Sequence, residues 1–300
     1  MTTKLGSIQT ATLEISYEDS GPETGAPVFL MHGWPYGPRV YDRVVPLLID
    51  AGCRTIVPCL RGFGRTRFLS SDTPRSGQQA ALGDDLRQLM DVLKIGSTIL
   101  VGYDWGGRAS CVAAALWPDR VRALVTGNGY NIQDIPNSGL PAAAEQELRH
   151  WYQYYFHLDR GRAGLNANRR ELCKLLWRLW SPNWEFDEET FLRTAACWDN
   201  PDFVDVTIQS YRHRYGNAPG DPALEPIEQA LAAQPPISVP TIVLHGEANG
   251  VVPAMSDKHQ RKFVNLVQRR NIPRVGHNLP AEAPEAVSEA VISLLKELTK

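Results

Sequence analysis

The chain has 300 residues, and 43% of them are hydrophobic, which is enough to bury one large core. Its 31 basic and 33 acidic residues leave a formal net charge of -2. No long run of one sign could follow a phosphate backbone or an anionic membrane, so we expect neither a nucleic acid nor a membrane as a partner. Five cysteines without a C-x-x-C pairing disfavour a disulfide framework or a sulfur-bound metal. We predict no metal site and no cofactor.

Two further properties concern the location of the protein. The first 21 residues contain no apolar segment of the kind found in secretory signals, and nowhere do 18 uncharged apolar residues follow one another. We therefore expect a cytoplasmic protein. The composition is compatible with a monomer or with a homodimer.

The first half of the chain alternates short apolar runs with helical patterns. Alternating apolar and polar residues at 8–17 predict a pair of exposed edge strands. Because each later strand is followed by a helix, the predicted fold class is α/β with a mostly parallel, doubly wound sheet. The predicted strands are 27–33, 54–60, 97–103 and 121–129, and the predicted helices between them are 40–52, 80–96 and 106–120.

The middle of the chain has a different pattern. Residues 135–235 are rich in Trp, Tyr, Arg and Leu at helical spacing, with no buried-strand run among them. We therefore predict a core formed by residues 1–134 and 236–300, with residues 135–235 inserted as a helical cap. The second core segment is expected to contain a strand at 239–246, a helix near 256–267, a short strand at 271–275 and a closing helix at 284–300.

The stretch VGYDWGGR at residues 101–108 places Asp104 between Gly102 and Gly106, at the end of a predicted strand. Glycines at this spacing allow a sharp turn from strand to helix, which lifts the central side chain above the carboxyl ends of the strands. The N–H groups that begin the next helix would then face developing negative charge. In isolation the aspartate could be an ordinary helix N-cap. Its position between an apolar strand and an Ala-rich helix favours a nucleophile.

Two other motifs stand in the order that such a site requires. HGWP at residues 32–35 follows a predicted strand, and VGHNLP at residues 275–280 places His277 after the last predicted strand. A lone histidine more often has a structural role. A nucleophile followed by a histidine near the C-terminus is nevertheless the chain order of the α/β-hydrolases, so we predict that His277 is the catalytic base.

HGWP, GYDWGG and GHNLP together resemble the α/β-hydrolase group that contains epoxide hydrolases, haloalkane dehalogenases and fluoroacetate dehalogenases, and the resemblance covers essentially the whole chain. It implies that Asp104 attacks an sp³ carbon to form an alkyl-enzyme ester, and that His277 activates the water that hydrolyses this ester. It also implies an oxyanion hole formed by the backbone N–H groups of Trp34 and Trp105. A carboxylate is ionised at neutral pH and needs no base to attack.

Epoxide hydrolases of this group use two cap tyrosines to hold and protonate the epoxide oxygen. The resemblance assigns this role to Tyr152 and Tyr211, with Tyr154 and Tyr155 as competitors for the first position. A neutral phenol suits the task because it donates a hydrogen bond and can give a proton to a basic alkoxide. Aromatic residues on helices more often only pack. The sequence predicts an epoxide hydrolase with a small apolar substrate, and Tyr155 is expected to help bind it.

A hydrolytic dehalogenase is the alternative activity. Arg108, four residues after Asp104, and the pair His150 and Trp151 resemble the substrate-binding residues of fluoroacetate dehalogenases. Trp105, however, stands where those enzymes carry a second arginine for the substrate carboxylate, which disfavours a small haloacid. A dehalogenase would release halide and tolerate the loss of the tyrosine hydroxyls.

Asparagine occupies both positions where the resembling enzymes place the acid that orients the histidine, namely Asn249 and Asn128. In a serine protease, Asp to Asn at this position lowers turnover about 10⁴-fold through the wrong histidine tautomer. Glu247 or Asp134 could replace the acid, Asn249 could orient His277 through its amide oxygen, or Asn249 could be altered by engineering or by deamidation next to Gly250. Failing these, the protein is a ligand-binding or turnover-impaired relative.

Overall fold

The computed structural model describes residues 3–299 and contains a central sheet whose order is β1-β2-β4-β3-β6-β7-β8-β9, with β5 paired to β2. The strands β3 to β9 of this path pair in parallel, whereas β2 pairs antiparallel with β1, β4 and β5. The sheet therefore has the predicted doubly wound, mostly parallel form. Its strands are β1 (Lys4–Gln9), β2 (Leu13–Ser20), β3 (Ala26–Met31), β4 (Cys53–Pro58), β5 (Arg67–Phe68), β6 (Thr98–Gly102), β7 (Val121–Gly127), β8 (Thr241–Gly246) and β9 (Leu266–Ile272).

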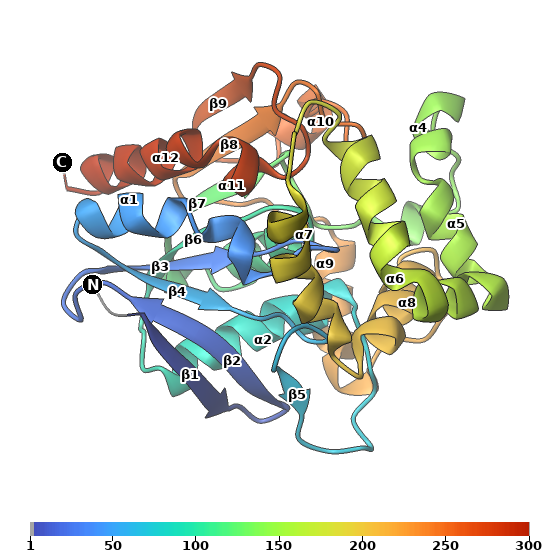
Figure 1. Cartoon of the computed structure of the whole chain (residues 1–300). Coiled ribbons are helices and arrows are strands. Elements are labelled where there is room, and N and C mark those ends of the chain that lie inside the picture. The colour runs from blue at the N-terminus through green and yellow to red at the C-terminus, as the bar shows by residue number, and fades with distance from the viewer. Residues whose placement is uncertain (1–2, 300) are drawn as a thin grey trace.

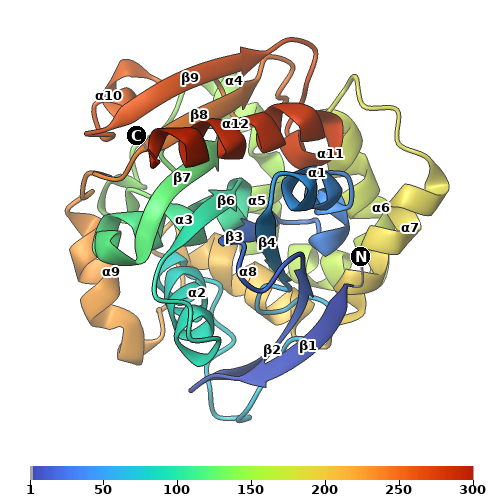
Figure 2. The ribbon, with the colours of Figure 1, turned by 90° about the vertical axis from the view of Figure 1, so that its left-hand side faces the viewer.

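Helices cover both faces of the sheet and its carboxyl end. Figure 2 shows α1, α11 and α12 on one face and α2, α3 and α9 on the other. In Figure 1, β3 and β6 run toward α5, α6 and α8, which lie beyond the carboxyl end of the sheet. The helices are α1 (Val44–Asp50), α2 (Gln79–Val92), α3 (Asp104–Leu116), α4 (Ala144–Arg149), α5 (Trp151–His157), α6 (Asp159–Trp180), α7 (Glu188–Ala195), α8 (Phe203–His213), α9 (Glu225–Ala232), α10 (Asp257–Gln260), α11 (Leu279–Glu282) and α12 (Pro284–Glu297).

The burial of the strands explains why the sequence predicts their positions. All residues of β6, TILVG, and of β8, TIVLHG, are buried, as expected for strands covered by helices on both faces. By contrast, β1 is mostly exposed, and β2 alternates between buried and partly exposed residues over its first three positions. The predicted edge pair at 8–17 therefore corresponds to these two strands.

The region after β8 differs from the prediction. The helix expected near 256–267 is a single turn, α10, in which the Ser256 hydroxyl accepts a hydrogen bond from the His259 N–H (3.3 Å). Leu266–Ile272 then pairs with Thr241–Gly246, so the strand expected at 271–275 begins earlier. Both predictions were wrong in extent, because β9 is a strand at the edge of the sheet with no fully buried residue, and it lacks an apolar run.

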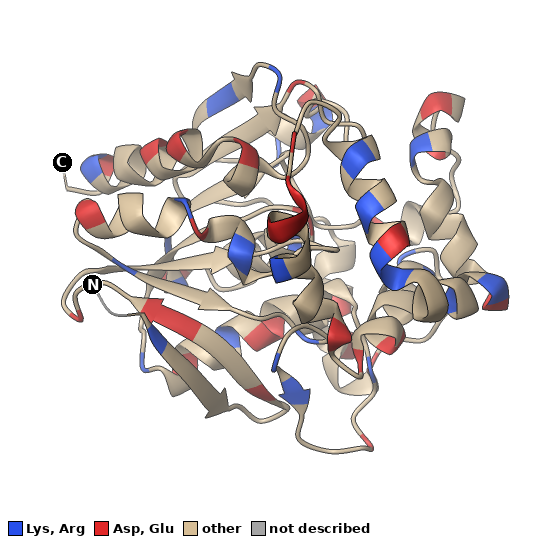
Figure 3. Ribbon diagram, in the orientation of Figure 1, with Lys and Arg blue, Asp and Glu red and all other residues tan. Residues whose placement is uncertain are grey.

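The segment between β7 and β8 is helical, as predicted. Helices α5, α6 and α8 pack against one another, whereas α9 packs against α2 of the core. Basic and acidic residues are interspersed along the ribbon of α6 (Figure 3). No helix within residues 3–299 combines the length and apolar character needed to cross a lipid bilayer.

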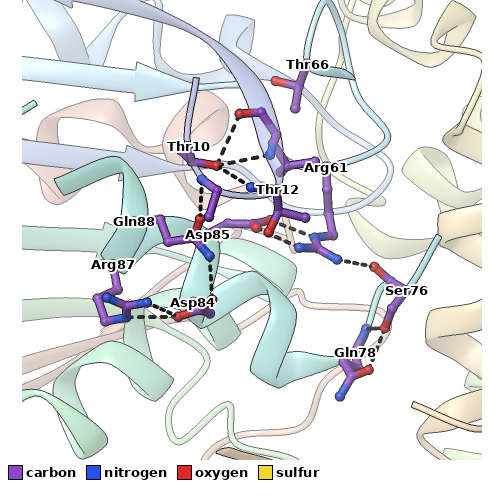
Figure 4. A network of polar contacts seen from close by, with 12 residues as sticks. Thr10, Thr12, Arg61, Thr66, Ser76, Gln78, Asp84, Asp85, Arg87 and Gln88 are labelled. Atoms are coloured by element: carbon purple, nitrogen blue, oxygen red, sulfur yellow. Dashed lines mark hydrogen bonds and ion pairs between the residues drawn. The ribbon is translucent and has the colours of Figure 1, made fainter. Parts of the chain in front are cut away.

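A buried ion pair fixes the loop between β4 and α2 (Figure 4). Arg61 donates two hydrogen bonds of 2.6 Å to the two carboxylate oxygens of Asp85 and a third of 2.8 Å to the Ser76 carbonyl. The side chains of Arg61 and Asp85 are only 3% and 9% exposed. Because the Asp85 carboxylate and the Ser76 carbonyl accept these hydrogen bonds, the positive charge of the buried Arg61 is compensated.

Asp85→Asn is expected to destabilise the protein by roughly 3–5 kcal/mol, because it leaves the buried Arg61 charge without its carboxylate. Urea unfolding followed by circular dichroism would measure the loss. Asp91→Asn is the matched control on the same helix, since Asp91 is 42% exposed and pairs with Arg87 and Arg120; it should cost at most about 1 kcal/mol. Equal losses for both variants would contradict the stabilising role assigned to the Arg61–Asp85 pair.

Candidate active site

Asp104 lies at the turn between β6 and α3 with φ 51°, in the left-handed region that non-glycine residues rarely adopt. Glycines on either side make this turn possible. A Cβ atom at Gly106 would overlap the carbonyl oxygen of Met31, and a Cβ at Gly102 would overlap that of Gly106. The GYDWGG sequence thus builds a tight elbow whose central side chain stands at the carboxyl end of the sheet.

The Asp104 carboxylate has two close polar neighbours. The Trp34 N–H donates a hydrogen bond of 2.7 Å to Oδ1, and His277 Nε2 lies 3.7 Å from Oδ2. Burial tends to raise the pKa of Asp104, but His277, the positive charge of Arg108 and the Trp34 N–H together lower it to about 2. The carboxylate is therefore ionised at neutral pH, as an attacking nucleophile requires.

The HGWP turn is held by His32. Its Nε2 accepts a hydrogen bond from the Leu60 N–H (3.1 Å), and its Nδ1 lies 3.0 Å from the Gly33 carbonyl. Burial lowers the pKa of His32 to about 4, so the ring is neutral at pH 7. The turn contains a cis Trp34–Pro35 peptide. The hydrogen bonds of His32 hold the turn from which the Trp34 N–H reaches Asp104.

Trp105 directly follows Asp104 in the first turn of α3, where backbone N–H groups have no acceptor within the helix. Its buried ring packs against Phe63 and Tyr211. Of the two predicted oxyanion donors, Trp34 thus already binds the carboxylate, while the N–H of Trp105 belongs to a helix start beside it.

His277 is brought to Asp104 by a loop that α6 and α11 hold in place. Its N–H lies within hydrogen-bonding distance of the Trp180 carbonyl (3.1 Å) and the Ser181 hydroxyl (3.0 Å). The Ser181 hydroxyl in turn donates to the Glu282 carboxylate (2.6 Å). Ser181 and Glu282 were not predicted, because they act on the backbone of the histidine and belong to no motif.

Asn249 contacts the far side of the His277 ring. Its Nδ2 lies 3.2 Å from His277 Nδ1 and donates a second hydrogen bond of 3.0 Å to Asn128 Oδ1. Its Oδ1 accepts from the N–H groups of Val251 (3.0 Å) and Val252 (2.9 Å). These two backbone donors fix which end of the amide is oxygen, so Asn249 turns its NH₂ group toward the histidine.

This orientation determines the tautomer of His277. An amide NH₂ can only donate, so Nδ1 must accept, and a neutral ring then carries its proton on Nε2. Nε2 faces Asp104 and has no hydrogen-bond partner among residues 3–299. The predicted alternative that Asn249 orients His277 through its amide oxygen is therefore wrong. The nitrogen that would have to accept a proton from water, Nε2, therefore already carries one.

Neither proposed replacement acid reaches the histidine. Glu247 is exposed, and the carboxylate oxygens of Asp134 bind the side chain of Asn137. Asn128 adopts φ 68° and contributes its amide oxygen to Asn249, while its own Nδ2 has no partner within residues 3–299. Among the described residues, an amide, that of Asn249, contacts His277 Nδ1 in place of an acid, and the amide of Asn128 lies behind it.

Tyr152 on α5 and Tyr211 on α8 lie side by side within the inserted helical segment. Both are buried, and their rings are 5.4 Å apart, edge to face. Burial raises the pKa of Tyr152 to about 12 and that of Tyr211 well above 10, and the negative charge of Asp104 adds to both shifts. Both phenols are therefore neutral hydrogen-bond donors at pH 7, within the electrostatic reach of Asp104. Trp34 packs against both rings.

The competing tyrosines point elsewhere. Tyr154 is 41% exposed and donates a hydrogen bond to Glu147, and the hydroxyl of Tyr155 lies against Gly164 of α6. His150 contacts the side-chain amide of Gln146 at 2.8 Å, and Trp151 packs on Tyr152 and Tyr155. The structure therefore does not bring Tyr155 together with Tyr152 and Tyr211 in the predicted site.

Two arginines act on the charges of the site. Arg108 lies one helical turn after Asp104 on α3, and the charge of Arg108 lowers the pKa of Asp104. Arg214, which was not predicted, follows Tyr211 by three residues, and its guanidinium carbon lies 4.4 Å from the centre of the Tyr211 ring. The i, i+3 spacing was the available signal, since it places two residues on one helix face. No cluster of three or more His, Cys, Asp or Glu able to hold a metal occurs within residues 3–299.

The fold and the elbow define a class of hydrolytic enzymes built on a doubly wound sheet. Comparison confirms the predicted relationship: the family described as the alpha/beta hydrolase fold matches residues 26–284, and the chain belongs to that family. An epoxide hydrolase from Caballeronia sordidicola is 26% identical over 313 residues, covering 95% of this chain and 92% of the relative. A haloalkane dehalogenase from Psychrobacter cryohalolentis is 25% identical over 289 residues, covering 95% and 88%.

Solved structures agree with this relationship. The crystal structure of a proposed epoxide hydrolase from Klebsiella pneumoniae superposes with a TM-score of 0.95 at 44% identity, covering 98% of this chain and 97% of the other. The protein is therefore an enzyme of the α/β-hydrolase superfamily, with epoxide hydrolases and haloalkane dehalogenases among its homologues.

Proposed function

We propose that the protein opens epoxides to diols through an ester on Asp104, with residues 135–235 acting as a cap over the site. The observation that carries the proposal is the pair of buried, neutral phenols of Tyr152 and Tyr211 close to an ionised carboxylate. A carbon–halogen bond needs no proton when it breaks, whereas an epoxide oxygen leaves as a basic alkoxide and needs one.

In the first step, a carboxylate oxygen of Asp104 attacks one ring carbon, and the bond from that carbon to the epoxide oxygen breaks. The alkoxide takes a proton from Tyr152 or Tyr211, and the ester replaces the carboxylate. In the second step, water attacks the ester carbonyl carbon of Asp104, and the bond from that carbon to the substrate oxygen then breaks, which releases the diol and restores the carboxylate. One proton of the water passes through His277 to the departing alkoxide, and the other returns to the tyrosine that lost its proton in the first step. The Trp34 N–H, already 2.7 Å from Oδ1, and the N–H of Trp105 would stabilise the oxyanion that forms.

The second step requires His277 to take a proton from water through Nε2. Because Asn249 favours the tautomer with a proton on this nitrogen, we expect ester hydrolysis to be slower than ester formation. The ester should then accumulate under turnover. A hydrolytic dehalogenase would pass through the same ester. Because a haloalkane dehalogenase is among the relatives of this chain, dehalogenation is the second candidate.

Intact-protein mass spectrometry during incubation with small epoxides tests the proposal. We expect one substrate mass to add to the wild-type protein within seconds to minutes, to localise to Asp104 on peptide mapping, and to be absent from Asp104→Ala. Diol measured in the same samples gives the rate of the second step. The proposal fails if neither adduct nor diol forms with any epoxide, and halide release from haloalkanes without an epoxide adduct would favour the dehalogenase.

A further inference from the structure

We propose that Gln153 is a positioning residue for epoxide opening: its side-chain NH₂ donates to the Tyr152 hydroxyl oxygen, which leaves the phenol proton available to the epoxide and stabilises the phenolate that forms. The identity of the leaving oxygen rests on the proposed function. The hydrogen bond itself involves no substrate, so it can be tested without one.

Gln153 follows Tyr152 on α5 and is buried, with only 3% of its surface exposed. Its Nε2 lies 3.0 Å from the Tyr152 hydroxyl oxygen. Its Oε1 accepts hydrogen bonds from Arg214 Nη1 (3.1 Å) and from the Tyr215 hydroxyl (3.0 Å). The amide thus connects α5, which carries Tyr152, to the end of α8, which carries Tyr211.

The neighbours of this amide fix its direction. A guanidinium group has no acceptor, so the atom of Gln153 that Arg214 contacts must be the oxygen. The other end of the amide is then the NH₂ group, which can only donate, so the Tyr152 hydroxyl accepts through its oxygen. Because Gln153 does not use the Tyr152 proton, that proton remains available to another acceptor. A bound epoxide would present such an acceptor in its ring oxygen.

The same contacts favour the ionised form of Tyr152. Burial raises the pKa of Tyr152 to about 12, while the positive charge of Arg214 and hydrogen bonds with Gln153 and Tyr211 oppose the rise. Burial raises the pKa of Tyr211 well above 10, and the negative charge that Tyr152 would carry adds to that shift. We therefore assign the proton transfer to Tyr152 and the role of second hydrogen-bond donor to Tyr211.

The charge that this transfer creates has partners in the structure. When the bond between carbon and epoxide oxygen breaks, the alkoxide takes the Tyr152 proton, and the O–H electron pair stays on the phenol oxygen. The Gln153 N–H then donates to a negatively charged oxygen, and a hydrogen bond to a charged group is worth more than one between neutral groups. A proton from the water of the second step restores the phenol.

Titration of residue 152 tests the hydrogen bond without turnover. With 3,5-difluorotyrosine at position 152, the fluorines bring ionisation of the phenol into a milder pH range, where fluorine NMR can follow it. Gln153→Glu keeps an acceptor for Arg214 and Tyr215 but replaces the NH₂ donor by a charged oxygen. We expect the pKa of the fluorinated phenol to rise by about 1 in Gln153→Met and by about 2 or more in Gln153→Glu.

Alkylation of Asp104 tests the consequence for the reaction. We expect Gln153→Met to slow labelling by 1,2-epoxybutane roughly 10-fold, and Gln153→Glu roughly 100-fold because its carboxylate would draw the Tyr152 proton away from the epoxide. Both losses should be smaller with 3,3,3-trifluoro-1,2-epoxypropane, whose alkoxide is less basic and depends less on a proton donor. A merely structural defect would slow both epoxides equally.

Gln229→Glu is the matched control, since it adds the same charge at an exposed position of α9. It should change neither the pKa of the fluorinated phenol nor the labelling rates. Thermal unfolding of each variant identifies misfolding, and Gln153→Met carries the test alone if Gln153→Glu does not fold.

The two measurements separate this inference from the proposed function. The same pKa of the fluorinated phenol in the wild type and in the Gln153 variants, or equal losses with both epoxides, would overturn the role of Gln153. A raised pKa in these variants, with no labelling of the wild type by either epoxide, would support the hydrogen bond to Tyr152 and refute the epoxide hydrolase.

Discussion

Asn249→Asp should accelerate hydrolysis of the Asp104 ester by roughly 10³- to 10⁴-fold, the reverse of the loss caused by Asp to Asn in a serine-protease triad. The aspartate could keep one oxygen on the N–H groups of Val251 and Val252 and turn the other toward His277 Nδ1. The ring would then carry its proton on Nδ1, and Nε2 would become free to accept a proton from water.

Asn128 can adapt to this change. Its amide oxygen now accepts from Asn249, and its Nδ2 has no partner within residues 3–299. A flip of the Asn128 amide would let that unused NH₂ donate to the new carboxylate, so the substitution does not require an unpaired buried charge. The surroundings of residue 249 are thus suited to an acid.

Quenched-flow mass spectrometry measures this prediction, because it records formation and decay of the ester separately. Asn249→Asp should leave the rate of ester formation within about threefold of wild type and shorten the life of the ester. Asn249→Ala is the control that removes the amide donor without adding a charge, and its ester should remain long-lived. An ester equally long-lived in wild type and Asn249→Asp would mean that the tautomer of His277 does not limit the second step.

The Asn249 amide also marks the limit of what the sequence alone could predict. Asn249 and His277 could be placed together because their spacing follows the family. The direction of the amide depends on two backbone N–H groups from Val251 and Val252, whose positions follow from the turn after β8. A one-dimensional pattern contains no information on that turn, so donor and acceptor could not be distinguished.

The same reason separates the elements that were predicted from those that were not. β6 and β8 are buried on both faces and show continuous apolar runs, so their positions follow from composition. β9 gains its structure from pairing with β8, and none of its residues is buried, so no apolar run identifies it. The spacing of three residues places Arg214 on the same side as Tyr211, but only the packing of α8 shows that this side belongs to the site.

The double variant Tyr152→Phe/Tyr211→Phe should lower the rate of Asp104 alkylation by an epoxide by about 10³-fold or more, because the leaving alkoxide loses both proton donors. Each single variant should lose less, since the remaining phenol can still donate to the same oxygen. Phenylalanine fills nearly the same volume in this buried aromatic cluster, so folding should be retained.

Tyr155→Phe provides the matched control for that double variant. The Tyr155 hydroxyl lies against Gly164, away from the paired phenols, so its removal should change alkylation less than about threefold. Halide release from a haloalkane tests the alternative activity, because a halide departs without a proton. If the protein is a dehalogenase, the double variant should still release halide. Alkylation by epoxide at the wild-type rate in the double variant would remove the main support for epoxide hydrolysis. A loss confined to epoxides would tie the two phenols to the protonation of the leaving oxygen.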